Sequence, residues 1–359
     1  MIPTAPAAGV TRRVAVIGCG DISALHLDAI AGLTDAELVA VADVHPDRLA
    51  AAAAACGVPG FDSYLELFDT VRPDVVHICT PHHLHASIAI DALERGIHVI
   101  QEKPLAHSRA EGDRLVAAAE RGNAKIAVCF QNRYNAPMQA AAALLASGEL
   151  GAVSGASATV MWHRGAEYYL DRPWRGRWAT GGGGLLMNQA IHTLDLLQWL
   201  VGEVASVRGN ASTRALGDTI EVEDTAEMVL EHTNGARSVF YATLANAVNA
   251  PITLDIVTEK ATLSLCGALT VSYTDGRVEV VPERSVAAGA RSYWGVSHQL
   301  LIEDFYARLD EPAPFWISPV QAQLSLNIIQ DVYDQTYPER ALDNGHVTTI
   351  TNEREATPL

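Results

Sequence analysis

The chain has 359 residues, of which 49% are hydrophobic, and it carries a formal net charge of −17 at pH 7. This length exceeds the needs of one typical core and suits two domains, with enough apolar residues to bury both. The negative charge and the lack of any run of Lys and Arg argue against a nucleic-acid partner and favour a soluble globular protein.

The cysteines and the lengths of the apolar runs bear on the cellular location of the protein. The five cysteines form no CxxC pair, and three of them lie in or beside apolar strand-like runs, so we interpret them as free thiols in a reducing environment. Residues 1–10 contain no apolar run of signal-peptide length, and no segment is long enough for a transmembrane helix. We expect a cytoplasmic protein with no membrane partner.

Short β-branched runs alternate with alanine-rich helical segments from residue 13 to about residue 130. We predict strands at 13–17, 37–42, 75–79, 97–100 and 125–129. We predict helices at 24–31, 46–56, 64–69, 84–95 and 109–121. This alternation is typical of a parallel sheet with helices on both faces. Residues 1–130 are therefore predicted to form a doubly wound α/β domain.

The pattern changes after a predicted helix at 136–147. Strand-like segments follow at 152–162, 205–213, 224–232, 237–245, 252–258, 261–265, 269–273 and 277–281. Several of them are joined by turn signals such as Asn234-Gly235 and Asp275-Gly276. Helices are predicted at 185–200, 297–309 and 319–335. Residues 131–359 should form an α+β domain with a mainly antiparallel sheet, and the tail after Pro338 should be loosely held or used in subunit contacts.

A glycine-rich turn follows the first predicted strand. The segment Gly18-Cys19-Gly20-Asp21-Ile22-Ser23 opens a helix, where backbone N–H groups can bind a pyrophosphate. Ser23 stands at the third glycine position, where a small side chain still fits close helix packing. Asp43 ends the second strand, and its carboxylate would bind ribose hydroxyls and repel a 2′-phosphate, which favours NAD over NADP. Arg48 lies nearby and is a further candidate contact.

Two more segments follow predicted strands and should reach the same edge of the sheet. The first is Thr80-Pro81-His82-His83-Leu84-His85. Its three histidines lack a matched carboxylate or cysteine set, so we expect helix capping and cofactor contact and no metal. The second is Gln101-Glu102-Lys103-Pro104, where ligands of open α/β sheets bind. The alternative for Lys103 is a solvated ion pair with Glu102.

A run of four glycines, residues 181–184, precedes a helix on which Asn188 and His192 share one face. We expect the glycines to let the backbone approach a ligand closely. A lone histidine on a helix is more often a core residue than a catalyst, but two aligned polar residues behind this run favour a site.

These motifs in this order resemble the Gfo/Idh/MocA oxidoreductase family, which includes glucose-fructose oxidoreductase and inositol dehydrogenases. The resemblance covers nearly the whole chain. It implies a Rossmann domain followed by an open-faced antiparallel sheet domain, NAD or NADP bound between them, and a homodimer or homotetramer formed through the sheet. The catalytic lysine of the family's EKP motif matches Lys103, and the catalytic histidine matches His192.

The chain departs from the family at Asn188, where many members carry an aspartate. An amide cannot act as a general base, so we expect Asn188 to contact a substrate hydroxyl while Lys103 and His192 move the proton. Histidine titrates near neutral pH, and desolvation beside the cationic nicotinamide would lower the pKa of Lys103. The candidate cofactor-binding residues are Gly18, Gly20, Asp21, Ile22, Ser23, Asp43, Arg48, Thr80, Pro81, His82, His85, Glu102 and Lys103.

Aromatic and arginine side chains gather between residues 162 and 178. Aromatic faces stack on sugar rings, and arginine binds hydroxyls or an anionic group. The same residue types are enriched in subunit interfaces. Each of these residues, taken singly, could therefore contact either a substrate or a second subunit. Residues 131–135 should also line the cleft. The candidate substrate contacts are Arg133, Arg164, Tyr168, Trp174, Arg175 and Asn188.

Two activities fit this set of residues. The first is an NAD-dependent dehydrogenase that acts on a ring hydroxyl of a sugar, sugar acid or cyclitol. The second is an NAD-dependent glycoside hydrolase that oxidises a sugar hydroxyl transiently, eliminates the aglycone, adds water and reduces again. The arginine-rich segment would suit an anionic glycoside. A non-enzymatic binding protein is disfavoured because Lys103 and His192 are both present.

Overall fold

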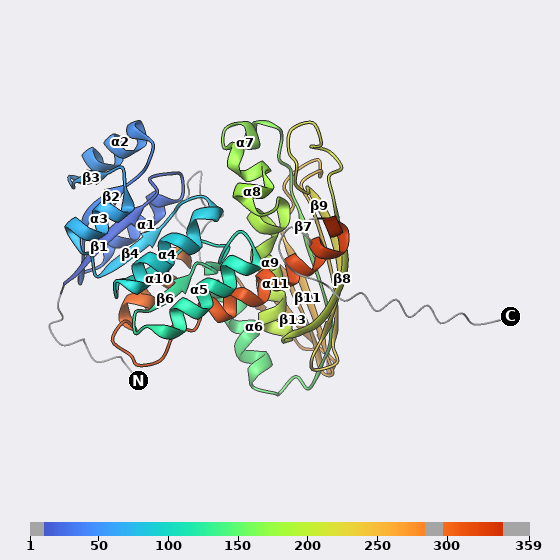
Figure 1. Ribbon diagram of the computed structural model, residues 1–359. Coiled ribbons are helices and arrows are strands. Elements are labelled where there is room, and N and C mark those ends of the chain that lie inside the picture. The colour runs from blue at the N-terminus through green and yellow to red at the C-terminus, as the bar shows by residue number, and fades with distance from the viewer. Residues whose placement is uncertain (1–10, 284–296, 340–359) are drawn as a thin grey trace.

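The computed structural model describes residues 11–283 and 297–339. Two β-sheets stand side by side with helices between them and on the outer face of the first sheet (Figure 1). None of the helices in the described residues has the length and apolar content needed to cross a bilayer.

The first sheet is parallel throughout and has the strand order β3-β2-β1-β4-β5-β6. Its strands are β1 (Arg12–Ile17), β2 (Ala36–Ala42), β3 (Gly60–Phe61), β4 (Val75–Ile78), β5 (His98–Gln101) and β6 (Ile126–Val128). The central strands are almost wholly apolar and buried, as expected for a sheet covered on both faces. This strand order is that of a Rossmann domain, and it confirms the predicted doubly wound sheet.

The helices of this first half begin and end at local signals in the sequence. They are α1 (Ser23–Gly32), α2 (Pro46–Cys56), α3 (Tyr64–Val71), the 3₁₀ turn η1 (His82–Leu84), α4 (His85–Glu94) and α5 (Arg109–Arg121). The hydroxyls of Ser63 and Ser108 accept hydrogen bonds from the backbone N–H groups of Glu66 and Glu111, which caps α3 and α5. Gly57 ends α2 in the left-handed conformation.

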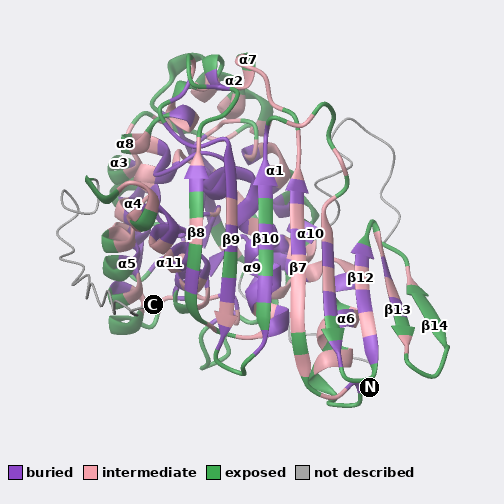
Figure 2. Cartoon of the chain, turned by 90° about the vertical axis from the view of Figure 1, so that its right-hand side faces the viewer, coloured by how far each residue is buried: buried purple, intermediate pink, exposed green. Residues whose placement is uncertain are grey.

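The second sheet has eight strands in the order β14-β13-β12-β11-β7-β10-β9-β8. They are β7 (Val153–Met161), β8 (Val204–Ser212), β9 (Thr225–His232), β10 (Arg237–Thr243), β11 (Thr253–Thr258), β12 (Ala261–Cys266), β13 (Ala268–Tyr273) and β14 (Val278–Val281). All neighbouring pairs are antiparallel except β7 and β10. Figure 2 shows one face of this sheet free of helices, with the helices behind it.

Helices of the second half connect the two sheets. They are η2 (Gln131–Tyr134), α6 (Ala136–Ala146), α7 (Glu167–Leu170), η3 (Pro173–Gly176), α8 (Trp178–Gly181), the π-helical turn η4 (Leu186–Ala190), α9 (Ile191–Val201), α10 (Ser297–Ala307) and α11 (Pro319–Thr336). Helix α10 packs on α1, and α11 packs on both α5 and β8. The chain therefore returns to its first sheet after completing the second.

The predicted fold class is confirmed, with three local differences. The two-residue strand β3 is too short to show in the hydrophobic pattern. The pairing of β7 with β10 is parallel because the chain crosses over between them. The helix predicted at 185–200 begins instead with the π-helical turn η4. The part of the predicted tail beyond residue 339 lies outside the described residues.

Candidate functional site

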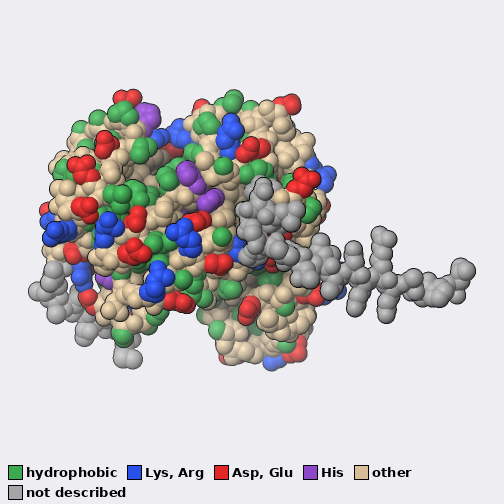
Figure 3. All heavy atoms as spheres, in the orientation of Figure 1, with side chains coloured by type: hydrophobic (Ala, Val, Ile, Leu, Met, Phe, Trp, Pro, Cys, Tyr) green, Lys and Arg blue, Asp and Glu red, His purple; other side chains and the backbone are tan. Residues whose placement is uncertain are grey.

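A cavity of about 850 Å³ lies at the carboxyl ends of the first sheet's strands and is closed by residues of the second half. In the space-filling view a notch separates two lobes at their upper edge, and Lys or Arg side chains lie beside it (Figure 3). Most of the predicted site residues line the cavity: Gly18, Gly20, Asp21, Ile22, Asp43, Arg48, Thr80, Pro81, His82, Glu102, Lys103, Arg164, Tyr168, Trp174, Arg175, Asn188 and His192. Ser23, His85 and Arg133 are not among the lining residues.

The glycine-rich turn leaves room for a ligand at one glycine and not at the other. A Cβ on Gly18, which has φ +91°, would lie 2.6 Å from the carbonyl oxygen of Cys79, whereas a Cβ on Gly20 would meet nothing within 4 Å. Helix α1 starts beside this open space without a side-chain cap. Ser23 is buried, and its hydroxyl donates to the carbonyl of Gly20 at 2.6 Å. The open turn fits a pyrophosphate at a helix N-terminus, and Ser23 shapes the turn from inside.

Asp43 is held in place by donors of the same edge. Its carboxylate accepts hydrogen bonds from the backbone N–H groups of Cys19 at 2.8 Å and His45 at 2.7 Å. The guanidinium of Arg48 lies 3.2 Å from the same carboxylate. A carboxylate has about four acceptor positions, so ribose hydroxyls can still bind. Arg48 therefore both pairs with Asp43 and lines the cavity.

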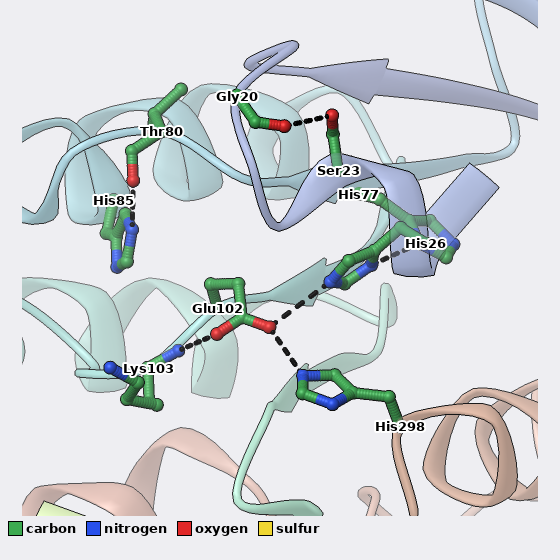
Figure 4. Close-up of polar contacts among 9 residues, drawn as sticks. All are labelled: Gly20, Ser23, His26, His77, Thr80, His85, Glu102, Lys103 and His298. Carbon is green, nitrogen blue, oxygen red and sulfur yellow. Dashed lines mark hydrogen bonds and ion pairs between the residues drawn. The ribbon is translucent and has the colours of Figure 1, made fainter. Parts of the chain in front are cut away.

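The three histidines predicted to lie near the cofactor use backbone carbonyls as partners. His82 contacts the carbonyl of Gly181 at 2.8 Å, and His83 contacts that of Thr180 at 3.3 Å, both in the second half. His85 lies 2.8 Å from the carbonyl of Pro104. Its other ring nitrogen lies 2.9 Å from the carbonyl of Thr80 (Figure 4). Burial lowers the pKa of His85, although hydrogen bonds to the two carbonyls raise it. The ring is therefore neutral at pH 7, and a neutral imidazole can donate to only one of the two carbonyls. His85 thus fixes the two loops and lies behind the cavity.

Lys103 reaches from the end of β5 to the second half of the chain. Its Nζ donates to the backbone carbonyl of Asn188 at 2.7 Å. Desolvation lowers the pKa of Lys103 to about 8, the charge of Glu102 opposes this, and Arg175 adds to it. The amine therefore titrates close to neutral pH, which suits a group that exchanges a proton with a substrate.

The π-helical turn η4 presents the carbonyl that holds Lys103. A π-turn bonds residue i to i+5 and is frequent at functional sites. Its start is fixed by Glu223, whose buried carboxylate accepts the backbone N–H groups of Gly184 and Leu186 at 2.8 Å each. The hydroxyl of Tyr333 donates to the same carboxylate at 2.7 Å.

The glycine run has a different role from the one predicted. A Cβ on Gly182 would overlap the backbone of His107, and one on Gly184 would overlap the carbonyl of Glu223. These glycines let protein segments pack against each other, and His107 belongs to the first half of the chain. The close approach is therefore between backbone segments and not between backbone and ligand.

His192 is the second residue of α9, two residues after the π-turn ends at Ala190, and it lines the cavity. Burial first, and then the positive charge of Lys103, lower the pKa of His192 to about 3. Its Nδ1 is buried without a hydrogen-bond partner among the described residues. At neutral pH the ring is therefore uncharged and can accept a hydrogen bond from a ligand.

Comparison with known proteins identifies the family. A family model described as an oxidoreductase family with an NAD-binding Rossmann fold matches residues 12–130, and the model of the GFO/IDH/MocA C-terminal domain matches residues 138–264. The chain belongs to the Gfo/Idh/MocA family. The predicted resemblance and the NAD-binding type of the first domain are thereby confirmed.

Named relatives of this Gfo/Idh/MocA chain are sugar dehydrogenases. D-apiose dehydrogenase of Paraburkholderia graminis is 29% identical over 63% of this chain and 58% of its own length. Levoglucosan dehydrogenase of Pseudarthrobacter phenanthrenivorans is 32% identical over 48% of this chain and 45% of its own length. The chain thus matches about half the length of these curated relatives.

Solved structures of the Gfo/Idh/MocA fold match almost the whole chain. The WlbA dehydrogenase of Bordetella pertussis, in complex with NADH and UDP-GlcNAcA, is 30% identical, covers 94% of this chain with 98% of its own, and has a TM-score of 0.78. A levoglucosan dehydrogenase in complex with NADH and levoglucosan has a TM-score of 0.81 at 23% identity, which speaks for the fold alone.

In this Gfo/Idh/MocA chain the arginine and aromatic segment forms one wall of the cavity. The guanidinium of Arg175 lies 4.4 Å above the ring of Tyr168, and that of Arg164 lies 5.5 Å above the same ring. Trp174 packs edge-on against His82. Arg175 and Arg172 also face Asp21 of the glycine-rich turn, at 3.8 and 3.1 Å. The wall is thus tied to both halves of the chain.

Arg133 does not contact the cavity, contrary to the prediction. It is 1% exposed and forms a two-pronged ion pair with Asp195, with distances of 2.8 and 2.7 Å. The rings of Trp199 and Trp316 flank its guanidinium. Its neighbours Gln131 and Asn132 do line the cavity. The 3₁₀ turn η2 directs these side chains apart, which spacing in the sequence does not reveal.

Several cavity residues were not predicted. They are Asp62, Tyr64, Trp162, Arg172, Gln189 and His298. Trp162, Arg172 and Gln189 lie inside segments already singled out, so sequence position offered a signal for them. His298 had none, because it enters from α10 and meets Glu102 across 196 positions.

Proposed function

We propose that this protein is an NAD-dependent dehydrogenase that moves a hydride between nicotinamide and a ring hydroxyl of a sugar, sugar acid or cyclitol. The observation that carries the proposal is the contact of Lys103 with the carbonyl of Asn188, inside a cavity shared with the glycine-rich turn and His192. The dehydrogenase names of the relatives support it. They do not favour the alternative of a redox-neutral glycosidase.

The residues of the cavity fit NAD. Gly20 leaves open space before α1 for the pyrophosphate, and Asp43 offers a carboxylate to the ribose hydroxyls. NAD, when bound, supplies the hydride acceptor in oxidation. The candidate cofactor contacts from the edge loops are Thr80, Pro81 and His82.

Lys103 takes the proton of the substrate hydroxyl in this mechanism. With a pKa of about 8, a substantial fraction of the amine is neutral near pH 7.5 and can accept the proton, and the ammonium form returns it in reduction. His192 is neutral and orients the hydroxyl by accepting a hydrogen bond. Asn188 has two tasks in this mechanism. Its backbone carbonyl holds Lys103, and its side-chain amide, whose nitrogen donates to the carbonyl of Gly184 at 3.3 Å, can use its oxygen for a second substrate hydroxyl.

The wall formed by Arg164, Tyr168, Trp174 and Arg175 selects the substrate. Aromatic faces cover the apolar face of a ring, and the guanidinium groups bind hydroxyls or an anionic substituent. We therefore place sugars and cyclitols with an acidic group among the first compounds to assay.

The test is a screen of sugars, sugar acids, inositols and glycosides with NAD, following NADH absorbance beside product release. Net NADH with a free sugar or cyclitol supports the dehydrogenase. Lys103→Met should lower kcat/KM by about 10²-fold or more, whereas Lys260→Met, at an exposed position, should not. Release of an aglycone without net NADH would contradict the proposal, as would full activity of the Lys103 variant.

We also propose that two copies of the chain pack through the open face of the second sheet. That face carries exposed apolar side chains, among them Val239 (51% exposed), Tyr241 (40%) and Val257 (44%). Light scattering should give at least twice the 38.3 kDa chain mass, and Val239→Glu should shift the protein to monomer. A cytoplasmic location is proposed on the five free cysteines, which suit a reducing compartment.

A further inference from the structure

A buried carboxylate lies directly behind Lys103. Glu102 is 6% exposed, and its Oε1 accepts hydrogen bonds from His26 Nε2 at 3.2 Å and His298 Nε2 at 2.9 Å. Its Oε2 lies 3.3 Å from the backbone N–H of Lys103. Figure 4 shows the two imidazoles converging on one carboxylate oxygen, His26 from above and His298 from below. His26 belongs to α1 and His298 to α10, so both ends of the chain meet at Glu102.

The hydrogen bonds continue behind His26 and settle its tautomer. His26 Nδ1 lies 2.9 Å from His77 Nδ1, and His77 Nε2 lies 3.1 Å from the hydroxyl of Tyr306. The ionised carboxylate of Glu102 can only accept hydrogen bonds, so the neutral ring of His26 carries its proton on Nε2 and donates to Glu102. Nδ1 of His26 then accepts from the Nδ1–H of His77, and Nε2 of His77 accepts from the hydroxyl of Tyr306, which burial keeps protonated by raising its pKa. Each donor in this series of hydrogen bonds, from Tyr306 to Glu102, has one acceptor.

This series of hydrogen bonds requires His26 and His77 to be neutral, and their burial favours the neutral form. His26 and His77 are fully buried, and desolvation lowers the pKa of each. Two imidazole N–H donors directed at one carboxylate stabilise its ionised form, and the pKa of Glu102 lies well below its ordinary value despite burial. Glu102 is therefore a fixed negative charge, one residue from Lys103.

That charge opposes the effect of burial on the neighbouring amine. Desolvation lowers the pKa of Lys103, and Glu102 raises it. Other groups with an electrostatic effect on this pair from the packed elements are Arg175, Cys79, Cys129, His82, His85 and His192. Burial keeps these histidines neutral and these thiols protonated. Glu102 and Arg175 are thus the charged neighbours that act on Lys103.

We propose that His26 and His298 are positioning residues that keep Glu102 ionised and thereby set the protonation state of Lys103, with His77 and Tyr306 holding His26 in its donating tautomer. The proposal deepens the proposed function, on which the catalytic task of Lys103 rests. The protonation state itself is independent of turnover and is measurable in a protein with no known substrate.

The experiment is a pH titration of Lys103 by NMR in the full chain labelled with ¹³Cε-lysine. The sequence contains three lysines, so the spectrum holds few signals, and Lys125 and Lys260 serve as internal controls. Lys103→Arg assigns the signal. The wild-type amine should titrate at about 8.

The variants remove the donors or the charge. Glu102→Gln should lower the pKa of Lys103 by about 1 unit or more, the size expected for losing a close opposite charge. His298→Leu removes one of the two donors and leaves His26 in place, so it should move the pKa of Lys103 in the same direction by less. His298→Gln keeps an N–H at the position of Nε2 and should leave Lys103 near the wild-type value. Tyr306→Phe is the mildest change and should move the pKa in the same direction by less, which keeps the test open if His298→Leu does not fold.

Opposite outcomes are clear. An unchanged Lys103 titration in folded Glu102→Gln would overturn the proposal, and so would equal shifts in His298→Leu and His298→Gln. A ring nitrogen of His26, a carboxylate oxygen of Glu102 and Cys129 Sγ lie within 4.8 Å of one another. Stoichiometric zinc in the purified protein would therefore replace this hydrogen-bond assignment. Absence of dehydrogenase activity with the expected NMR shifts would overturn only the proposed function.

Discussion

Proton transfer in the proposed reaction depends on single side chains whose pKa values differ from the ordinary ones. Lys103 titrates near 8 because burial outweighs the attraction of Glu102, whereas His192 stays neutral far below pH 6. In the proposed mechanism the two groups that the sequence assigns jointly to proton transfer therefore have different tasks. Lys103 would exchange the proton, and His192 would accept a hydrogen bond from the substrate.

The first prediction concerns pH. In the oxidation direction only the neutral amine of Lys103 accepts a proton, so kcat/KM should rise with pH and level off above about 8. No step should appear near pH 6.5, the ordinary pKa of histidine, if His192 does not titrate there. The measurement is the initial rate of NADH formation across pH 5.5–9.5 with the best substrate of the screen; a limb centred near 6.5 would assign the proton to His192 instead.

A second prediction at this scale concerns the ion pair of Arg133 with Asp195, each 1% exposed. Arg133→Met leaves the carboxylate buried without its partner and should cost about 3–5 kcal/mol of unfolding free energy. Arg133→Met combined with Asp195→Asn removes both charges and should recover part of that loss. Urea unfolding followed by circular dichroism measures both, and an equal loss in the double variant would show that the pair acts through packing alone.

At the scale of elements, the π-helical turn η4 joins the second half to the catalytic edge. Its start depends on Gly184, because a side chain there would overlap the carbonyl of Glu223. Gly184→Ala should destabilise the fold by about 1–3 kcal/mol and displace the Asn188 carbonyl from Lys103. Gly217→Ala is the matched control, since a Cβ there meets nothing within 4 Å. Thermal unfolding and kcat, measured together, test whether the turn carries both effects.

The elements also show where the sequence is informative. Alternating β-branched and alanine-rich segments predict the parallel sheet, and glycines before a helix predict the site of the pyrophosphate. The π-turn was missed because its hydrophobic pattern over only five residues cannot be told from that of an α-helix. Arg133 was misplaced and His298 missed for a different reason. Which way a side chain points within a short turn, and which helix returns to a distant strand, depend on packing between segments far apart in the chain.

At the scale of the whole molecule, the division at residue 130 remains a prediction, and the C-terminal helices complicate it. Helix α10 packs on α1, and α11 bridges α5 and β8. Leu301, Ile302 and Phe305 of α10 are fully buried. A fragment of residues 1–130 should therefore expose apolar surface, bind a hydrophobic dye and lack a cooperative thermal transition. Adding residues 297–339 through a flexible linker should restore the transition; a stable, cooperative fragment 1–130 would contradict this view.

The return of α10 to the first sheet has a consequence for the order in which the protein is made. A chain growing on the ribosome has Glu102 and Lys103 in place almost two hundred residues before His298 appears. Until then the carboxylate lacks one of its two imidazole donors. In the proposed mechanism Lys103 reaches its working charge only after residue 298 has been made, so a shorter nascent chain carries the Glu102-Lys103 motif without the contacts that set this charge.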